Sequence, residues 1–177
     1  MSSPATSSAL SKPGYWLMKS EPDEVSIDDL ARAPHQTLPW TGVRNYQARN
    51  FIRDDMVPGD GVLFYHSSCP QPGIAGVARI AGEPSPDTTQ WNASSPYFDV
   101  KSLPAQPRWL QIRVKLVRKT RLLSLAEMRQ QQSLQTLQVL RRGNRLSITP
   151  VTAEEWAAVL LLLDTGWQQA AAPQHRL

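Results

Sequence analysis

The segment 108–118 constrains the fold most, because apolar and polar residues alternate along it with a period of two. The apolar positions are Leu110, Ile112, Val114 and Leu116, and the positions between them are Gln111, Arg113, Lys115 and Val117. Successive side chains of a strand point to opposite faces, so this pattern predicts a half-buried strand with one basic face. Such strands are typical of an antiparallel sheet or barrel.

Other short segments predict further strands and short helices. Apolar runs at 15–19, 61–66, 74–80 and 146–150 predict strands, and the loop 67–73 joins the second and third of these into a hairpin. Gly76 inside the hairpin predicts a bulge or a close approach by another group. Ser26, Ser124 and Thr152 are predicted N-caps, and the helix after Thr152 should run to about Leu163.

The composition of the chain predicts one domain with two extensions. Residues 1–14 are rich in Ser, Ala and Pro and carry one charge, so they predict a disordered N-terminal leader. The domain itself should span 15–163, and residues 164–177 should form a frayed C-terminal tail. The segment 83–107 contains Trp91, Tyr97 and Phe98, which predicts a long ordered loop that folds onto the domain.

The segment 40–52 is the first candidate for a site, because it combines Trp40 with Gly42, two arginines and several amides. A helix that starts near Val43 or Arg44 would leave Trp40 just outside its N-terminus, and residues 33–39 would form a loop before it. An aromatic ring beside amide and guanidinium donors suits a planar polar ligand such as a nucleobase. The alternative is a helix with core aromatics and solvated arginines.

Charge is unevenly distributed along the chain. Residues 101–145 contain eleven Lys or Arg residues and one acid, Glu127, which gives +10, whereas the rest of the chain carries 8 − 14 = −6. This basic segment predicts a polyanionic partner, and the alternative is a solvated basic surface.

The single Cys69 and three scattered histidines predict no disulfide, no metal and a reducing compartment, namely the cytoplasm or, in a eukaryote, the nucleus.

No apolar run in the sequence approaches the roughly 20 residues of a membrane span, so we expect no membrane partner.

Five ordered motifs resemble the EVE domain, as found in the thymocyte nuclear protein family and its bacterial relatives. The motifs are residues 15–22, 40–52, 64–67, 73–76 and 145–151. The resemblance covers roughly residues 14–163.

The resemblance implies an α+β fold of the PUA-like type, a mixed and mostly antiparallel β-barrel with short peripheral helices. PUA-like relatives, including YTH and SRA domains, bind nucleic acids, and several hold one flipped, modified base in an aromatic pocket. It therefore implies a non-enzymatic reader of a modified base in DNA or RNA, without a cofactor or catalytic residue. The implied base-binding residues are Lys19, Ser20, Glu21, Trp40, Val43, Arg44, Asn45, Tyr46, His66, Ser67, Tyr97 and Asp99.

Phosphate binding would come from cations near that pocket and along the basic strand, since such contacts add affinity without sequence choice. The predicted phosphate-binding residues are Arg44, Arg49, Arg108, Arg113, Lys115 and Arg118. Two other functions fit the same residues. The pocket could sense a free nucleoside, or Glu21 and His66 could act as the acid and base of a hydrolase or nuclease. A monomer is the expected oligomeric state.

Overall fold

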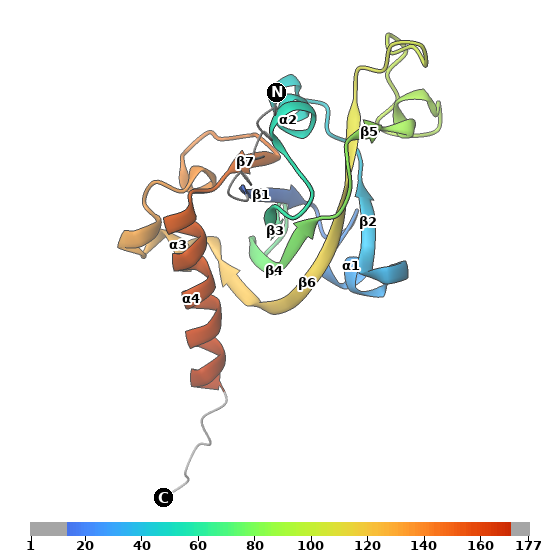
Figure 1. Cartoon of the computed structure of the whole chain (residues 1–177). Coiled ribbons are helices and arrows are strands. Elements are labelled where there is room, and N and C mark those ends of the chain that lie inside the picture. Colours follow the sequence, from blue (N-terminus) through green and yellow to red (C-terminus); the bar gives the residue numbers. More distant parts are fainter. Residues whose placement is uncertain (1–13, 171–177) are drawn as a thin grey trace, which may run out of the picture.

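The computed structural model describes residues 14–170 and the side chains of residues 14–165 (Figure 1). The predicted leader, 1–14, lies outside the described residues except for Gly14, and so does the end of the predicted tail. Within the described residues no helix is long and apolar enough to cross a membrane.

Seven strands form one mixed sheet within the described residues. They are β1 (Tyr15–Ser20), β2 (Thr37–Trp40), β3 (Gly61–His66), β4 (Gly73–Ile80), β5 (Ser85–Pro86), β6 (Leu110–Ser124) and β7 (Ile148–Pro150). Their order is β2-β6-β4-β3-β1-β7, with β5 also paired to β6, and β1–β3 is a parallel pair whereas the others are antiparallel. The α+β class is confirmed, although the sheet is an open path and not the closed barrel of the expectation.

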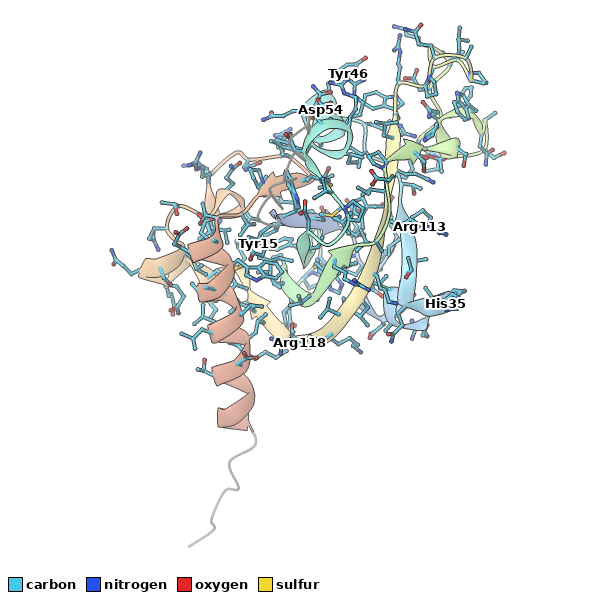
Figure 2. The ribbon with its side chains drawn as sticks, viewed as in Figure 1. Tyr15, His35, Tyr46, Asp54, Arg113 and Arg118 are labelled. Carbon is cyan, nitrogen blue, oxygen red and sulfur yellow. The ribbon has the colours of Figure 1, made fainter. Side chains whose placement is uncertain are left out.

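Strand β6 is the longest strand and curves across the whole sheet (Figure 1). Its side chains alternate as predicted, because Ile112 and Val114 are buried whereas Arg113 is exposed. Arg113 and Arg118, both labelled in Figure 2, lie on the solvent side of the strand. The strand continues to Ser124, beyond the predicted end at 118, and pairs with β2, β4 and β5.

Two apolar clusters cover the two faces of the sheet. Strand β1 serves both clusters, since Trp16 and Met18 join one of them and Leu17 joins the other. The first cluster contains Trp40 and packs under helices α1 (Ile27–Arg32) and α2 (Tyr46–Asn50). The second packs under α3 (Leu125–Arg129) and α4 (Ala153–Ala170).

The predicted helix starts at Ser26, Ser124 and Thr152 are confirmed by hydrogen bonds. The Ser26 hydroxyl accepts from Asp29 N and the Asp29 carboxylate accepts from Ser26 N, and Ser124 Oγ accepts from Glu127 N at 3.1 Å. Thr152 Oγ1 accepts from the N–H of the third helical residue in the same way. Helix α4 reaches Ala170, past the predicted end at Leu163 and into the predicted tail.

The prediction was wrong around Trp40. Residues 33–39 were expected to be a loop, but Thr37–Trp40 pair with β6 as edge strand β2. Pro39 argues against a strand in the sequence, because proline cannot donate a backbone hydrogen bond to a neighbouring strand. It is tolerated here because β2 is an edge strand. Helix α2 begins at Tyr46 after the N-cap Asn45, two residues beyond Arg44.

Gly76 confirms the predicted bulge and close approach. The registers of β4 against β3 and β6 shift beside it. A Cβ at this position would lie 2.5 Å from Ile27 Cδ1 and 3.1 Å from the carbonyl oxygen of Arg118. The missing side chain therefore lets α1 pack directly against the sheet.

Candidate functional site

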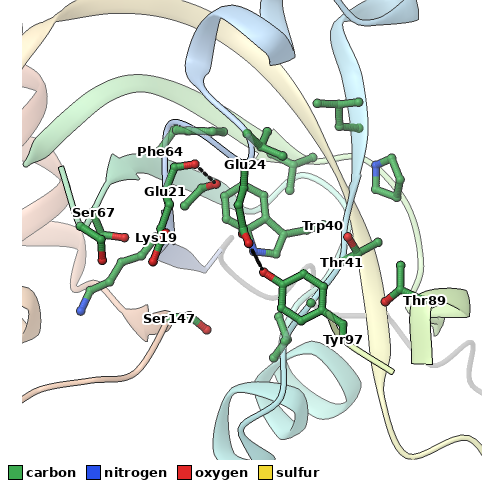
Figure 3. A pocket seen from close by; sticks show the side chains of 18 of the residues that line it. Lys19, Glu21, Glu24, Trp40, Thr41, Phe64, Ser67, Thr89, Tyr97 and Ser147 are labelled. Carbon is green, nitrogen blue, oxygen red and sulfur yellow. Dashed lines mark hydrogen bonds between the residues drawn. The ribbon is translucent and has the colours of Figure 1, made fainter. Parts of the chain in front are cut away.

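A cavity of about 730 Å³ opens beside the ends of β1 and β3, next to the edge strand β2 (Figure 3). This volume suits a small ligand, since protein ligand pockets are typically ~300–1,000 Å³. Its wall is formed by polar groups from several loops and its floor by apolar groups. The polar residues that line it are Lys19, Ser20, Glu21, Glu24, Thr41, Ser67, Ser68, Thr89, Ser95, Tyr97, Asn144, Arg145 and Ser147.

Trp40 lines this cavity while its other side packs into the core. The indole meets the Phe64 ring edge to face, with the centroids 5.3 Å apart, and only 9% of the residue is exposed. Figure 3 shows the indole behind Glu24 and Tyr97. Because Phe64 holds the indole in place and also lines the cavity, the two rings form a rigid aromatic floor.

A hydrogen bond between two distant loops closes one side of the cavity. The Tyr97 hydroxyl donates to the Glu24 carboxylate, at 2.6 Å from Oε1 and 2.7 Å from Oε2 (Figure 3). Burial of the phenol and its bond to Glu24 raise the pKa of Tyr97 to about 12. The Tyr97 ring lies on Gly42, whose φ is +80° and whose Cβ, if present, would be 2.7 Å from Tyr97 Cζ.

Asp87 holds this wall from behind. Its carboxylate is fully buried and accepts from Gly42 N at 2.8 Å, from Arg44 Nη1 at 2.9 Å and from the N–H and hydroxyl of Thr89. Burial raises the pKa of this carboxyl, but hydrogen bonds from Thr89, Gly42 and Arg44 outweigh burial and hold the pKa below its ordinary value. Arg44 Nε also donates to the carbonyl oxygen of Tyr97 at 3.0 Å.

Seven of the predicted base-binding residues line the cavity, as its wall or its floor. These are Lys19, Ser20, Glu21, Trp40, Val43, Ser67 and Tyr97. Arg44 is not among the lining residues, because its guanidinium points to the buried Asp87. Arg44 therefore supports the wall and does not face the cavity.

Asn45 and Tyr46 also lie outside the cavity. The Asn45 side chain caps α2 by accepting from Ala48 N at 3.1 Å. Tyr46 is 53% exposed on the surface (Figure 2) and stacks on Trp109 with the ring centroids 4.9 Å apart. Both side chains are thus occupied with the local structure of the segment 45–50.

His66 and Asp99 have partners away from the cavity as well. His66 Nε2 accepts from Ile27 N, the first N–H of α1, at 3.0 Å. Burial lowers the pKa of His66, and the nearby Asp28 partly opposes this. Asp99 accepts from Trp109 Nε1 at 2.8 Å. Glu21 lines the cavity and His66 does not, so the structure does not bring the predicted acid–base pair together there.

The six predicted phosphate-binding residues divide into two groups. Four contact acceptors of the protein: Arg44 pairs with Asp87, Arg49 with the Asn50 amide, Arg108 with Asp99 and Arg118 with Asp164. Arg113 and Lys115 have no side-chain hydrogen bond or ion pair within the described residues, and both line a second cavity on the outer face of the sheet.

The loop 144–147 is also part of the site, although it was not among the predicted site residues. Arg145 and Ser147 line the cavity, and the loop is held beside β1 because Lys19 N donates to Ser147 O at 2.8 Å. Lys19 Nζ reaches Asn144 O at 3.4 Å, and burial lowers the pKa of Lys19. The motif 145–151 was the available signal, but its contact with β1 is non-local.

Among residues 14–165, no group of three or more His, Cys, Asp or Glu side chains is placed to hold a metal ion.

Comparison with known proteins gives consistent relatives over most of the chain. The EVE domain model matches residues 14–162. The chain is 42% identical to human thymocyte nuclear protein 1 over 165 residues, which covers 84% of this chain and 73% of the relative. The yeast Schizosaccharomyces pombe has an uncharacterized protein that is 39% identical over 157 residues, which covers 80% of this chain and 65% of that protein.

Solved structures agree with this result. A Pseudomonas syringae protein aligns with a TM-score of 0.80 and 48% identity, covering 84% of this chain and 98% of that one. Human THYN1, solved in complex with 5-methylcytosine containing DNA, aligns with a TM-score of 0.78 and 42% identity, covering 85% and 98%. A YTH domain solved with N6-methyladenosine RNA is similar in fold alone, at a TM-score of 0.51 and 12% identity.

Proposed function

The chain belongs to the EVE domain family, and from this premise we propose that it is a non-enzymatic nucleic-acid-binding protein that reads one modified base flipped into its cavity. The observation that carries the proposal is the cavity with its aromatic floor of Trp40 and Phe64. The human relative solved with 5-methylcytosine containing DNA supports it and makes that base the first probe to use.

Stacking on an aromatic ring can offset most of the free energy that is needed to flip the base. Unstacking a base costs a few kcal/mol, and stacking on an aromatic ring returns ~1–3 kcal/mol. A methyl group on the base would add about 0.8 kcal/mol when it is buried against apolar atoms. Leu38, Val43 and Val114 line the cavity and offer such atoms.

The polar wall would select the edge of the base. The Glu21 carboxylate has no hydrogen-bond or salt-bridge partner within the described residues, although it lines the cavity. A carboxylate accepts hydrogen bonds and cannot donate them, so it favours a base with an exocyclic amine over one with a carbonyl oxygen at the same place. Cytosine is therefore preferred to thymine in this proposal.

The mouth of the cavity would hold the phosphates beside the flipped nucleotide. Lys19 and Arg145 are the cations that line it. Of the residues proposed from sequence, Lys19, Ser20, Glu21, Trp40, Val43, Ser67 and Tyr97 remain our candidates for contact with the base. Arg44 is a positioning residue in this proposal, because it acts through Asp87 and Tyr97.

Binding assays with the Trp40→Ala variant test the proposal. The probes are short duplexes with 5-methylcytosine, cytosine or thymine at one mismatched position, where flipping is easiest. The wild type should prefer 5-methylcytosine, and Trp40→Ala should lose about tenfold in affinity for it, the equivalent of ~1.4 kcal/mol of stacking, and with it the preference. Glu21→Gln should reduce the preference over thymine in particular.

Unchanged discrimination by the folded Trp40→Ala variant would refute the proposal. The competing function, a sensor of a free nucleoside in the same cavity, predicts a different result. A free methylated nucleoside would then bind as tightly as the duplex, and its binding would not depend on salt.

A further inference from the structure

A second cavity of about 640 Å³ lies on the outer face of the sheet, and we call it the outer groove. The turn 34–36, the edge strand β2 and the outer sides of β4 and β6 bound it. Figure 2 labels His35 and Arg113, two of its lining residues, on the same side of the molecule. The complete lining is Pro34, His35, Thr37, Leu38, Pro39, Pro58, Gly59, Arg79, Ile80, Ala81, Arg113 and Lys115.

The outer groove carries positive charge only. Arg79, Arg113 and Lys115 line it, and no Asp or Glu does. Within the described residues none of these three side chains makes a hydrogen bond or an ion pair. Arg118 differs, although it lies on the same strand and is also exposed, because it pairs with Asp164 at 2.9 Å.

The strand register places these charges against one another. Arg79 of β4 is directly opposite Lys115 of β6 in an antiparallel pair, and Arg113 is two residues from Lys115 on the same face. Like charges at directly opposite positions destabilise a sheet. The protein alone leaves this repulsion uncompensated, and a bound anion would relieve it.

The outer groove adjoins the base-binding cavity. Leu38 and Pro39 of β2 line both cavities, so only this edge strand separates them. Arg113 and Lys115 are two residues apart along β6, roughly 6.8 Å, and Arg79 lies across the sheet from Lys115. Three cations spread over two strands suit the successive phosphates of a nucleic-acid strand better than one small anion.

We propose that the outer groove binds backbone phosphates of the same nucleic acid whose base enters the cavity, with the strand passing over the β2 edge. This inference rests on the proposed function. Phosphate contacts position a nucleic acid but do not read its sequence, so the groove supplies affinity and the cavity supplies the choice of base.

Salt titration of duplex binding tests the inference with the triple variant Arg79→Ala, Arg113→Ala, Lys115→Ala. Each phosphate contact makes the slope of log K against log salt more negative by about 0.9. Losing three contacts should therefore reduce the magnitude of this slope by about 2.7. Affinity should fall by the same factor for 5-methylcytosine and cytosine duplexes, and the preference between them should remain. The variant should fold at least as stably as the wild type, because repulsion is removed, and thermal unfolding checks this.

The single variants Arg113→Ala and Arg118→Ala give a matched control on one strand. Arg113→Ala should lower the slope by about 0.9, and Arg118→Ala should lower it much less because Asp164 already neutralises that cation. An unchanged slope in the triple variant, or an equal loss with Arg118→Ala, would overturn the inference. So would groove-dependent binding of inorganic phosphate with no change in duplex binding.

The same assays separate this inference from the proposed function. If Trp40→Ala keeps base discrimination while the triple variant loses slope, the proposed function fails and the groove remains a nucleic-acid contact. If the triple variant keeps its slope while Trp40→Ala loses discrimination, the groove fails and the base-binding cavity remains.

Discussion

Asp87→Asn should weaken the cavity wall without changing the size of the buried side chain. The carboxylate now accepts from Gly42 N, from Arg44 and from two donors of Thr89. An amide keeps one acceptor oxygen and places an NH₂ group against the remaining donors. It also leaves the guanidinium of Arg44 without its counter-charge.

The expected cost follows from the burial of the pair. Removing one partner of a buried ion pair costs about 3–5 kcal/mol. The Asp87 side chain is fully buried, but 21% of the Arg44 side chain is exposed, so water can partly solvate the remaining cation. We therefore expect a loss of about 3 kcal/mol, at the low end, which corresponds to a fall in Tm of roughly 6–12 °C for a chain of this size.

The lowered pKa of Asp87 predicts how the stability difference between wild type and Asp87→Asn changes with pH. Because the pKa of Asp87 is lower in the folded state, its stabilisation is fully present above the unfolded value of about 3.9 and is lost as pH falls through the folded pKa. The difference between wild type and Asp87→Asn should thus be largest near neutral pH and should shrink below about pH 4.

Urea unfolding at several pH values measures this difference directly. Asp54→Asn is the control, because Asp54 makes an exposed ion pair with Arg53 and should change stability little. Equal stability of Asp87→Asn and wild type at pH 7 would refute the role assigned to this carboxylate. A difference that grows in acid would refute it too.

Two further predictions concern the same region of the fold. Gly42→Ala should destabilise the protein by on the order of 1–2 kcal/mol because alanine disfavours the positive φ. The new Cβ would also clash with the ring of Tyr97 and add to this cost. In thermal unfolding, the double variant Gly42→Ala, Tyr97→Ala should recover only the part of the loss that is due to the clash. His66 accepts from Ile27 N only when neutral, and its pKa is lowered by burial, so its stabilisation is present above about pH 6.5 and is lost as pH falls through the lower folded pKa. Wild type should lose stability over that range in urea, and a His66→Asn variant that showed the same loss would contradict this.

Local patterns predicted much of the fold. The N-caps Ser26 and Ser124 and the alternation of β6 depend on neighbours in sequence, and all three are confirmed. Strand β2 was missed because it is short and contains Pro39.

The candidate site was less predictable because its contacts are non-local. Arg44 looked like a free donor in the sequence, yet its partner Asp87 lies 43 residues away in another loop. Tyr97 similarly bonds Glu24 across 73 residues. The roles of the site residues, the monomeric state and the cytoplasmic or nuclear location stay predictions.

The bare backbone of Gly76 sets the shape of the cavity from a distance. It lets α1 sit close to the sheet through Ile27, and Glu24, three residues earlier, carries the carboxylate that meets Tyr97. A larger residue at position 76 would push α1 away from the sheet, and the side of the cavity wall that contains Glu24 would move with it. The width available to a ligand thus depends on a residue within the sheet that does not itself line the cavity.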